Sequence, residues 1–190
     1  MIYAAGVDPY CYVGTTVLKN VPGLRDQADL DRFEAVSFAL RSEEPLPAGP
    51  LTVRHYFAVH RHLLRDVYRW AGKPRTIRIS KGGNPFCYPE NIGPELDRLF
   101  LWLHAEHCLT GLSDDKFAAK LAHFLAELNA IHAFREGNGR AQNAFALIVG
   151  AHAGHPLRME ALDPKAYLEA MIVSFAGKEG PLADQLQMLL

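Results

Sequence analysis

The hydrophobic positions of this chain recur mostly at intervals of three and four residues, the spacing of one face of an α-helix. Asp26 or Asp29 is suited to cap the first helix, and the Pro- and Gly-rich stretch EEPLPAGP ends it near Leu40. The pattern predicts later helices over about residues 52–70, 96–103, 117–131, 139–149 and 164–175.

Two segments depart from this helical spacing. In residues 75–89, Ile77 and Ile79 alternate with polar residues, and Gly82-Gly83-Asn84-Pro85 supplies turn residues, so we expect a small β-hairpin. Residues 1–25 are rich in Gly, Pro and aromatic residues without a sustained period, and we expect an irregular arm. The chain contains no repeat and no linker, which predicts a single, mainly α domain over residues 1–190, a helical bundle carrying one hairpin.

The composition describes a folding chain without a dominant charge. Of its 190 residues 49% are hydrophobic, and 20 Lys and Arg balance 21 Asp and Glu. The net charge of −1 gives no global basic field, so nucleic acid is not an expected partner. The sequence has no run of about 18 apolar residues and no signal peptide, which predicts a cytoplasmic protein without a membrane partner. The cysteines are odd in number and form no CxxC pair, so they indicate neither disulfides nor a zinc site. They are Cys11, Cys87 and Cys108.

Residues 131–145, IHAFREGNGRAQNAF, hold the candidate chemistry between two predicted helices. Gly137-Asn138-Gly139 is able to aim main-chain N–H groups at one anion beside the positive end of the next helix. Arg140 adds a cation for phosphate, Glu136 is a suitable Mg²⁺ ligand, and His132 titrates where a general base must. Each feature alone is more often a helix cap or a structural histidine, but their occurrence within nine residues favours a nucleotide site.

These nine residues, HAFREGNGR, resemble the signature HxFx(D/E)GNGR of the Fic family. Further segments are similar to short bacterial Fic toxins, so the resemblance covers nearly the whole chain. They are Asp8-Pro9-Tyr10, Gly14-Thr15, Val17-Leu18-Lys19-Asn20, residues 67–72 and residues 75–83.

The resemblance implies a Fic-fold protein adenylyltransferase that moves AMP from ATP, with Mg²⁺, to a Tyr, Ser or Thr hydroxyl of a target protein. By position in the motif, His132 is the general base, Glu136 positions the metal and Arg140 contacts the β-phosphate. Phe134 anchors the loop, and Gly137, Asn138 and Gly139 form the anion hole. The related Doc kinases carry lysine at the position of Gly139, so this glycine favours nucleotidyl transfer over phosphorylation.

Two positions depart from the family pattern. Ala133 replaces the proline common after the motif histidine, which touches no chemistry. Asn143 stands where many members carry a second arginine for the γ-phosphate, and an amide supplies no charge there. Two alternatives therefore remain: a transferase of the same scaffold that uses another nucleotide or diphosphate donor, and a catalytically weak module that binds partners.

The predicted hairpin has a counterpart in Fic proteins, a flap that pairs as a strand with the target main chain. Residues 76–79 would supply this edge; they are Thr76, Ile77, Arg78 and Ile79. Lys81 is a candidate contact to nucleotide or target, with a solvated lysine as the alternative.

Control and partners follow from the same resemblance. Fic proteins are commonly restrained by a helix bearing (S/T)xxxE(G/N), which this sequence lacks. The resemblance therefore implies a toxin inhibited in trans by a small antitoxin, or alternatively an effector translocated into a host cell. His55, His60 and His62 share a predicted helix with three arginines, a pattern more typical of a solvated or interface face than of a reaction centre.

Overall fold

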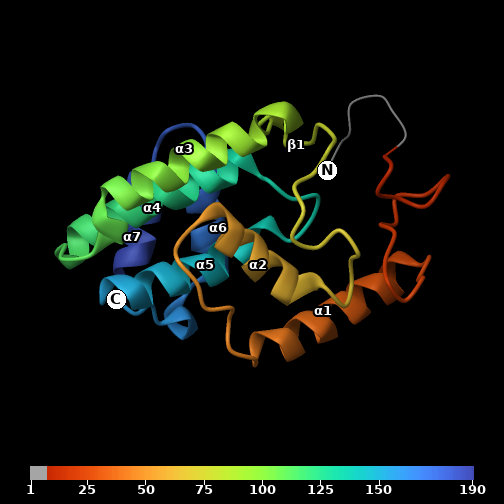
Figure 1. The fold of residues 1–190 in the computed structure, drawn as a ribbon, viewed down its shortest axis with the longest axis horizontal. Coiled ribbons are helices and arrows are strands. Elements are labelled where there is room, and N and C mark those ends of the chain that lie inside the picture. The colour runs from red at the N-terminus through yellow and green to blue at the C-terminus, as the bar shows by residue number, and fades with distance from the viewer. Residues whose placement is uncertain (1–7) are drawn as a thin grey trace. The chain divides into compact units, whose positions relative to one another are not determined.

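The structure, a computed structural model, describes residues 8–190 and is mainly α-helical, as the hydrophobic pattern predicts. The chain, whose course Figure 1 shows, divides into two compact units. The first comprises the described part of Met1–Ile92 together with Ala133–Ala141, and the second comprises Gly93–His132 and Gln142–Leu190. The prediction of one domain over residues 1–190 stays a prediction.

Two helices frame the first unit, α1 (Gln27–Ser42) and α2 (Val53–Leu64), which pack on each other. Each begins where a short polar side chain accepts a main-chain N–H: Asp26 caps α1 and Thr52 caps α2. Helix α2 ends at Leu64, well before residue 70, the predicted end. The main-chain N–H groups of Val67 and Tyr68 both bond to the carbonyl of Leu64, which closes a turn there.

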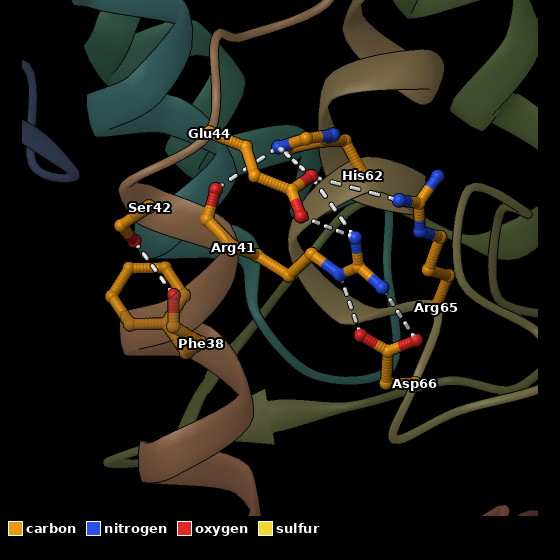
Figure 2. A network of polar contacts seen from close by, with 7 residues as sticks. All are labelled: Phe38, Arg41, Ser42, Glu44, His62, Arg65 and Asp66. Carbon is orange, nitrogen blue, oxygen red and sulfur yellow. Dashed lines mark hydrogen bonds and ion pairs between the residues drawn. The ribbon is translucent and has the colours of Figure 1, made fainter.

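A network of charged side chains joins the C-terminal ends of α1 and α2 (Figure 2). Arg41 at the end of α1 holds Asp66 with two nitrogens, Nε at 2.5 Å and Nη2 at 3.0 Å. Its Nη1 donates to Glu44 at 2.7 Å, and Arg65 and His62 approach the same carboxylate. Bidentate arginine–carboxylate geometry is directional, so this ion pair ties the end of α1 to the segment that follows α2.

The hairpin lies inside the predicted range of residues 75–89, but its strands differ from the prediction. Strands β1 (Ser80–Lys81) and β2 (Asn84–Pro85) pair antiparallel across Gly82 and Gly83, whose φ angles of 58° and 84° suit a two-residue loop. Asn84-Pro85 is therefore strand and not turn. Residues 76–79 are not paired as a regular strand, although the carbonyl of Ile79 accepts the N–H of Phe86 at 3.2 Å.

Residues 8–25 form no helix, and one isolated bridge joins Cys11 and Leu18. A short 3₁₀ turn, η1 (Pro89–Asn91), follows the hairpin. Residues 1–7 of the predicted arm lie outside the described residues.

The second unit is built around the buried helix α4 (Asp114–Ile131), which packs against α6 (Pro164–Ser174) and α7 (Gly180–Gln187). Helix α3 (Ile92–Ala105) runs beside α4 (Figure 1), where Phe100 meets Phe124 edge to face. The sequence pattern missed α7, because its eight residues bury only Leu182 and Leu186.

The remaining elements of the second unit connect these helices. They are η2 (His107–Leu109), α5 (Asn138–Ala153), whose first turn belongs to the first unit, and η3 (Met159–Ala161). Among the described residues, no helix is both long and apolar enough to cross a lipid bilayer.

Candidate functional site

The predicted base, His132, ends helix α4 in a left-handed conformation with φ 48° and ψ 59°. Its main-chain N–H reaches the carbonyl of Leu128 at 2.9 Å, the contact of an αL helix cap. Its ring Nδ1 lies 3.3 Å from the carbonyl of Asn129, and a carbonyl only accepts. The neutral ring therefore carries its proton on Nδ1, so that Nε2 is the basic nitrogen.

The loop that follows is closed by its own asparagine. The Asn138 side chain accepts the N–H of Phe134 at 2.9 Å and donates to the carbonyl of Phe134 at 2.8 Å. At the start of the loop, the carbonyl of Ala133 accepts the N–H of Arg75 at 2.8 Å. The buried side chain of Asn138 therefore shapes the loop, and both of its polar groups are bonded to Phe134.

Phe134 is fully buried, as expected of the loop anchor. Its ring stacks on His60 of α2 with 3.6 Å between the ring centroids, and Tyr56 and Phe57 of the same helix also contact it. Helix α2 is thus the floor on which the loop rests.

Gly137 is the position where the loop turns toward α5. Its φ of 79° favours glycine, and a Cβ there would lie 2.2 Å from Leu64 Cδ1, so any larger residue would also displace the Leu64 side chain. The first main-chain bond of α5 runs from the N–H of Ala141 to the carbonyl of Gly137 at 3.0 Å. The N–H groups of Asn138, Gly139 and Arg140 precede that bond and form the positive end of the helix.

Arg140 and Glu136 lie close to this helix end. Arg140 Nη2 is 2.6 Å from the Glu34 carboxylate of α1 and 3.7 Å from Glu136 Oε1. The same Glu136 oxygen accepts the main-chain N–H of Gly137 at 3.0 Å. Tyr68 donates its hydroxyl to the other oxygen of Glu34; burial, and then the charge and hydrogen bond of Glu34, raise the pKa of Tyr68. The N–H of Gly137, the first of the turn, therefore already donates to an anionic oxygen, that of Glu136.

Sequence reasoning missed the residue that ties the arm to the loop. Arg135 is buried, and its guanidinium holds Asp8 at 2.9 and 3.0 Å. Tyr10 of the same arm accepts the main-chain N–H of Thr76 at 3.1 Å. The segment Asp8-Pro9-Tyr10, noted above only as a resemblance, was the signal for this contact.

The three histidines of α2 are buried, so the expectation of a solvated or interface face for them was wrong. Each ring meets a main-chain carbonyl: His55 that of Pro47, His62 that of Arg41, and His60 that of Glu136. The carbonyls sit in segments outside the helix, which is why helical spacing alone did not reveal them.

Burial of His60 makes stability depend on pH. Burial is the largest cause that lowers the pKa of His60 from 6.5 to about 4, and the charge of Arg140 adds to it. The pKa of His60 is lower in the folded than in the unfolded protein. The stability that the neutral ring contributes is therefore fully present above pH 6.5 and is lost as the pH falls toward 4. We expect a loss of about 3 kcal/mol in the free energy of unfolding over that window.

Urea unfolding of wild type and His60→Gln at pH 7.5 and pH 4.5 measures this contribution, because glutamine does not titrate. Identical pH dependence in the two proteins would contradict a neutral, buried His60.

The remaining predicted site residues lie on α5 and the hairpin. Asn143 follows Arg140 by one helical turn, and its Oδ1 accepts the hydroxyl of the buried Tyr167 of α6 at 3.1 Å. In the hairpin, Lys81 and Arg78 are exposed and Ile79 is buried. The sequence motif gave no sign of the contact to Tyr167.

The hairpin is anchored by Arg75, a buried residue that sequence reasoning passed over. Its guanidinium donates to the carbonyl of Ile77 at 2.6 Å and to that of Cys87 at 2.5 Å, on the two arms of the hairpin. Burial lowers the pKa of this guanidinium. The hairpin and the loop therefore share one anchor, since the main-chain N–H of Arg75 also binds Ala133.

Comparison with known proteins gives one consistent result. The Fic/DOC family model matches residues 50–149. A relative in Sinorhizobium fredii, "Probable protein adenylyltransferase y4lH", is 48% identical over 99% of this chain and 98% of its own length. The "Probable protein adenylyltransferase Fic" of Escherichia coli is 35% identical over 88% of this chain and 84% of its own length.

Solved structures agree with this result. The BepC protein of Bartonella tribocorum, solved with bound AMPPNP, has a TM-score of 0.84 and 26% identity over 95% of both chains. A Fic domain of Bartonella quintana, solved with bound ADP, has a TM-score of 0.85 and 26% identity, covering 95% of this chain and 93% of that one.

Proposed function

Because this chain belongs to the Fic/DOC family, we propose that it is a protein adenylyltransferase whose loop from His132 to Arg140 transfers AMP from ATP to a target hydroxyl. The names of its relatives support the activity, and the nucleotides bound in related structures support the substrate. The observation that carries the assignment is the arrangement of this loop: a base with a basic Nε2, then a helix N-terminus whose amides precede the first helical bond.

The loop residues divide the chemistry between them. Nε2 of His132 removes the proton from the target hydroxyl, whose oxygen attacks the α-phosphorus of ATP. The bond from that phosphorus to the bridging oxygen of the β-phosphate breaks, and pyrophosphate leaves. The amides of Gly137, Asn138 and Gly139, together with that of Arg140, face the charge that develops on the transferred group, where fixed donors stabilise the transition state.

Glu136 is the residue we assign to Mg²⁺. The described residues contain no cluster of three His, Cys, Asp or Glu side chains that could hold a metal ion by themselves. This fits Mg²⁺, which proteins often bind through one or two carboxylates while substrate phosphates supply the other ligands. When bound, the ion neutralises phosphate charge; Glu136 holds a carboxylate oxygen beside the N–H of Gly137 where those phosphates would lie.

Residues 76–79 are proposed to dock the target, with Arg78 as the central residue. The N–H of Thr76 is bonded to Tyr10, and the carbonyls of Ile77 and Ile79 are bonded to Arg75 and Phe86. For the N–H and carbonyl of Arg78, no partner exists in the part of the chain that the structure describes. A target strand would pair with these two groups.

Replacing Arg78 with proline is expected to reduce modification of the target about tenfold or more, because it removes the outward N–H and a pairing hydrogen bond. Nucleotide affinity should stay unchanged, since the side-chain partners of Arg78 are Glu90 and the Tyr88 ring, outside the loop. Label transfer and ATP titration on the same preparation measure both. Arg78→Ala, which keeps the N–H, is the control, and equal losses of target modification and ATP affinity in Arg78→Pro would instead assign the hairpin to the nucleotide pocket.

Asn143 favours a second candidate, a donor without a γ-phosphate, because its amide is bonded to Tyr167 and carries no charge. Replacing Asn143 with Arg is expected to strengthen ATP binding about tenfold, since a charge-assisted contact contributes about 1.5 to 3 kcal/mol. ADP should gain much less. Tyr167 loses its acceptor in this variant, so Asn143→Arg with Tyr167→Phe is the matched protein that removes that cost.

Calorimetry with ATP and ADP on wild type and the double variant decides this point. An unchanged preference between the two nucleotides would show that position 143 does not face the triphosphate, and ordinary ATP-dependent AMP transfer would then be the simplest account.

The proposal also covers how the enzyme is inhibited and where in or outside the producing cell it acts. The absence of an (S/T)xxxE(G/N) segment from the sequence supports a separate small antitoxin. The Bartonella neighbours are described as VirB-translocated effectors, which supports translocation as the alternative to a cytoplasmic toxin.

Transfer from labelled ATP tests the proposed reaction. The chain is incubated with a cell lysate and ATP labelled at either the α- or the γ-phosphate. AMP transfer predicts protein-bound label from the α-position alone. Label from the γ-position alone would identify a kinase, and no label from either would identify a binding module or another donor.

A further inference from the structure

We propose that His60 is a positioning residue of the phosphate-binding loop, whose ring fixes the peptide between Glu136 and Gly137 so that its N–H faces the phosphates. This inference rests on the proposed function, since it assumes that the loop binds phosphate. His60 lies on α2, far from the motif in sequence, and its ring is fully buried.

Two hydrogen bonds settle the chemical state of the ring. The main-chain N–H of Gly72 donates to Nδ1 at 2.8 Å, so Nδ1 presents a lone pair. The proton of the neutral ring is then on Nε2, which lies 3.0 Å from the carbonyl of Glu136 and donates to it. His60 thus joins two main-chain segments, and both bonds require the neutral ring.

Gly72, whose N–H donates to Nδ1 of His60, is itself held in place. Gly72 has φ 78°, and a Cβ there would lie 2.7 Å from Arg61 Cβ and 2.9 Å from the carbonyl of Phe57. Its main chain is therefore pressed against α2, where only glycine fits. Because Gly72 is held in this way, its N–H orients the ring of His60 independently of the loop.

The ring also contacts the loop through packing. It stacks on Phe134 with 3.6 Å between centroids and 21° between the planes. A Cβ on Gly137 would lie 3.3 Å from Nε2, so this glycine passes close over the ring edge. His60 therefore lies against the loop at three places: Phe134, the carbonyl of Glu136 and Gly137.

The planarity of the peptide bond converts this contact into an effect on phosphate binding. The carbonyl of Glu136 and the N–H of Gly137 belong to one trans peptide and point in opposite directions. Because the bond to His60 holds the carbonyl of Glu136 toward α2, the N–H of Gly137 points away from α2. That N–H donates to an anionic oxygen, Glu136 Oε1 at 3.0 Å, so the donor is oriented toward negative charge.

Three variants separate this role from simple core packing. His60→Phe keeps an aromatic ring but loses both hydrogen bonds, and His60→Gln restores polar groups. His62→Phe is the matched control, because His62 is buried on the same helix and contacts the carbonyl of Arg41, outside the loop, at an equal 3.0 Å. Displacement of a fluorescent ATP analogue by ADP and by adenosine measures each affinity, and circular dichroism checks the fold.

We expect His60→Phe to weaken ADP binding about tenfold or more while the affinity for adenosine, which has no phosphate, is retained. His60→Gln should recover part of the loss, and His62→Phe should change neither affinity. An unchanged ratio of ADP to adenosine affinity in His60→Phe overturns the inference. If that variant does not fold, the same ratio in His60→Gln decides.

Failure of the proposed function gives a different result. Arg140→Gln is expected to weaken ADP binding because it removes the proposed phosphate cation. An Arg140→Gln protein that binds ADP like wild type would reject the loop as the phosphate site. If Arg140→Gln weakens ADP binding and His60→Phe does not, the site stands and the role of His60 is rejected.

Discussion

Replacing His132 with asparagine is expected to lower AMP transfer by about 10²- to 10⁴-fold, the usual contribution of a general base. Asparagine tolerates the left-handed conformation at φ 48°, so the cap of α4 is kept while the basic Nε2 is lost. Nucleotide affinity should stay the same, because the amides of α5 and Arg140 are untouched. Label transfer under saturating ATP, with circular dichroism on the same sample, measures the effect.

His152, near the other end of α5, provides the control for removing a histidine from the chain. His152→Asn should transfer AMP like wild type. If His132→Asn kept full activity with an intact fold, the base would have to be sought elsewhere.

Replacing Gly137 with alanine is expected to lower the free energy of unfolding by about 2 to 4 kcal/mol. The Cβ would lie 2.2 Å from Leu64 Cδ1, and the φ of 79° is unfavourable for alanine. Either the Leu64 side chain or the loop must move to relieve the clash, and the left-handed φ strains the loop that carries the phosphate donors. Nucleotide binding should therefore fall together with stability, as measured by urea unfolding and ATP titration.

Gly139 is the matched control, two residues further along the same loop. A Cβ at Gly139 would meet nothing within 4 Å, and the residue lies in the first turn of α5. Gly139→Ala should keep or raise stability, because alanine is the better helix former by about 1 kcal/mol. Equal destabilisation by both substitutions would mean that contact with α2 does not set the shape of the loop.

The loop was predictable because its chemistry and its spacing are local. His132, Glu136, Gly137 and Arg140 are close in sequence, and a turn between two helices brings such residues together without knowledge of the rest of the fold. The helical spacing located α4 correctly for the same reason, since its apolar face repeats over eighteen residues.

The supports of the loop could not be predicted, because each joins residues far apart in sequence. His60 meets Glu136 across 76 positions, and Asp8 meets Arg135 across 127. A buried polar side chain looks like a solvated one in a sequence, so the helix pattern placed His60 on a polar face. The strands of the hairpin differ from the predicted ones for another reason. Gly82 and Gly83 alone make the turn, so Asn84 belongs to the second strand.

The central claim is that this loop moves AMP, and not phosphate, onto a protein hydroxyl. Mass spectrometry of a modified target peptide, with the released product measured in the same reaction, tests it most directly. The account predicts adenosine monophosphate on a Tyr, Ser or Thr side chain, one pyrophosphate released per modification, and loss of both in His132→Asn. A peptide that carries only phosphate, with ADP as the product, would contradict it.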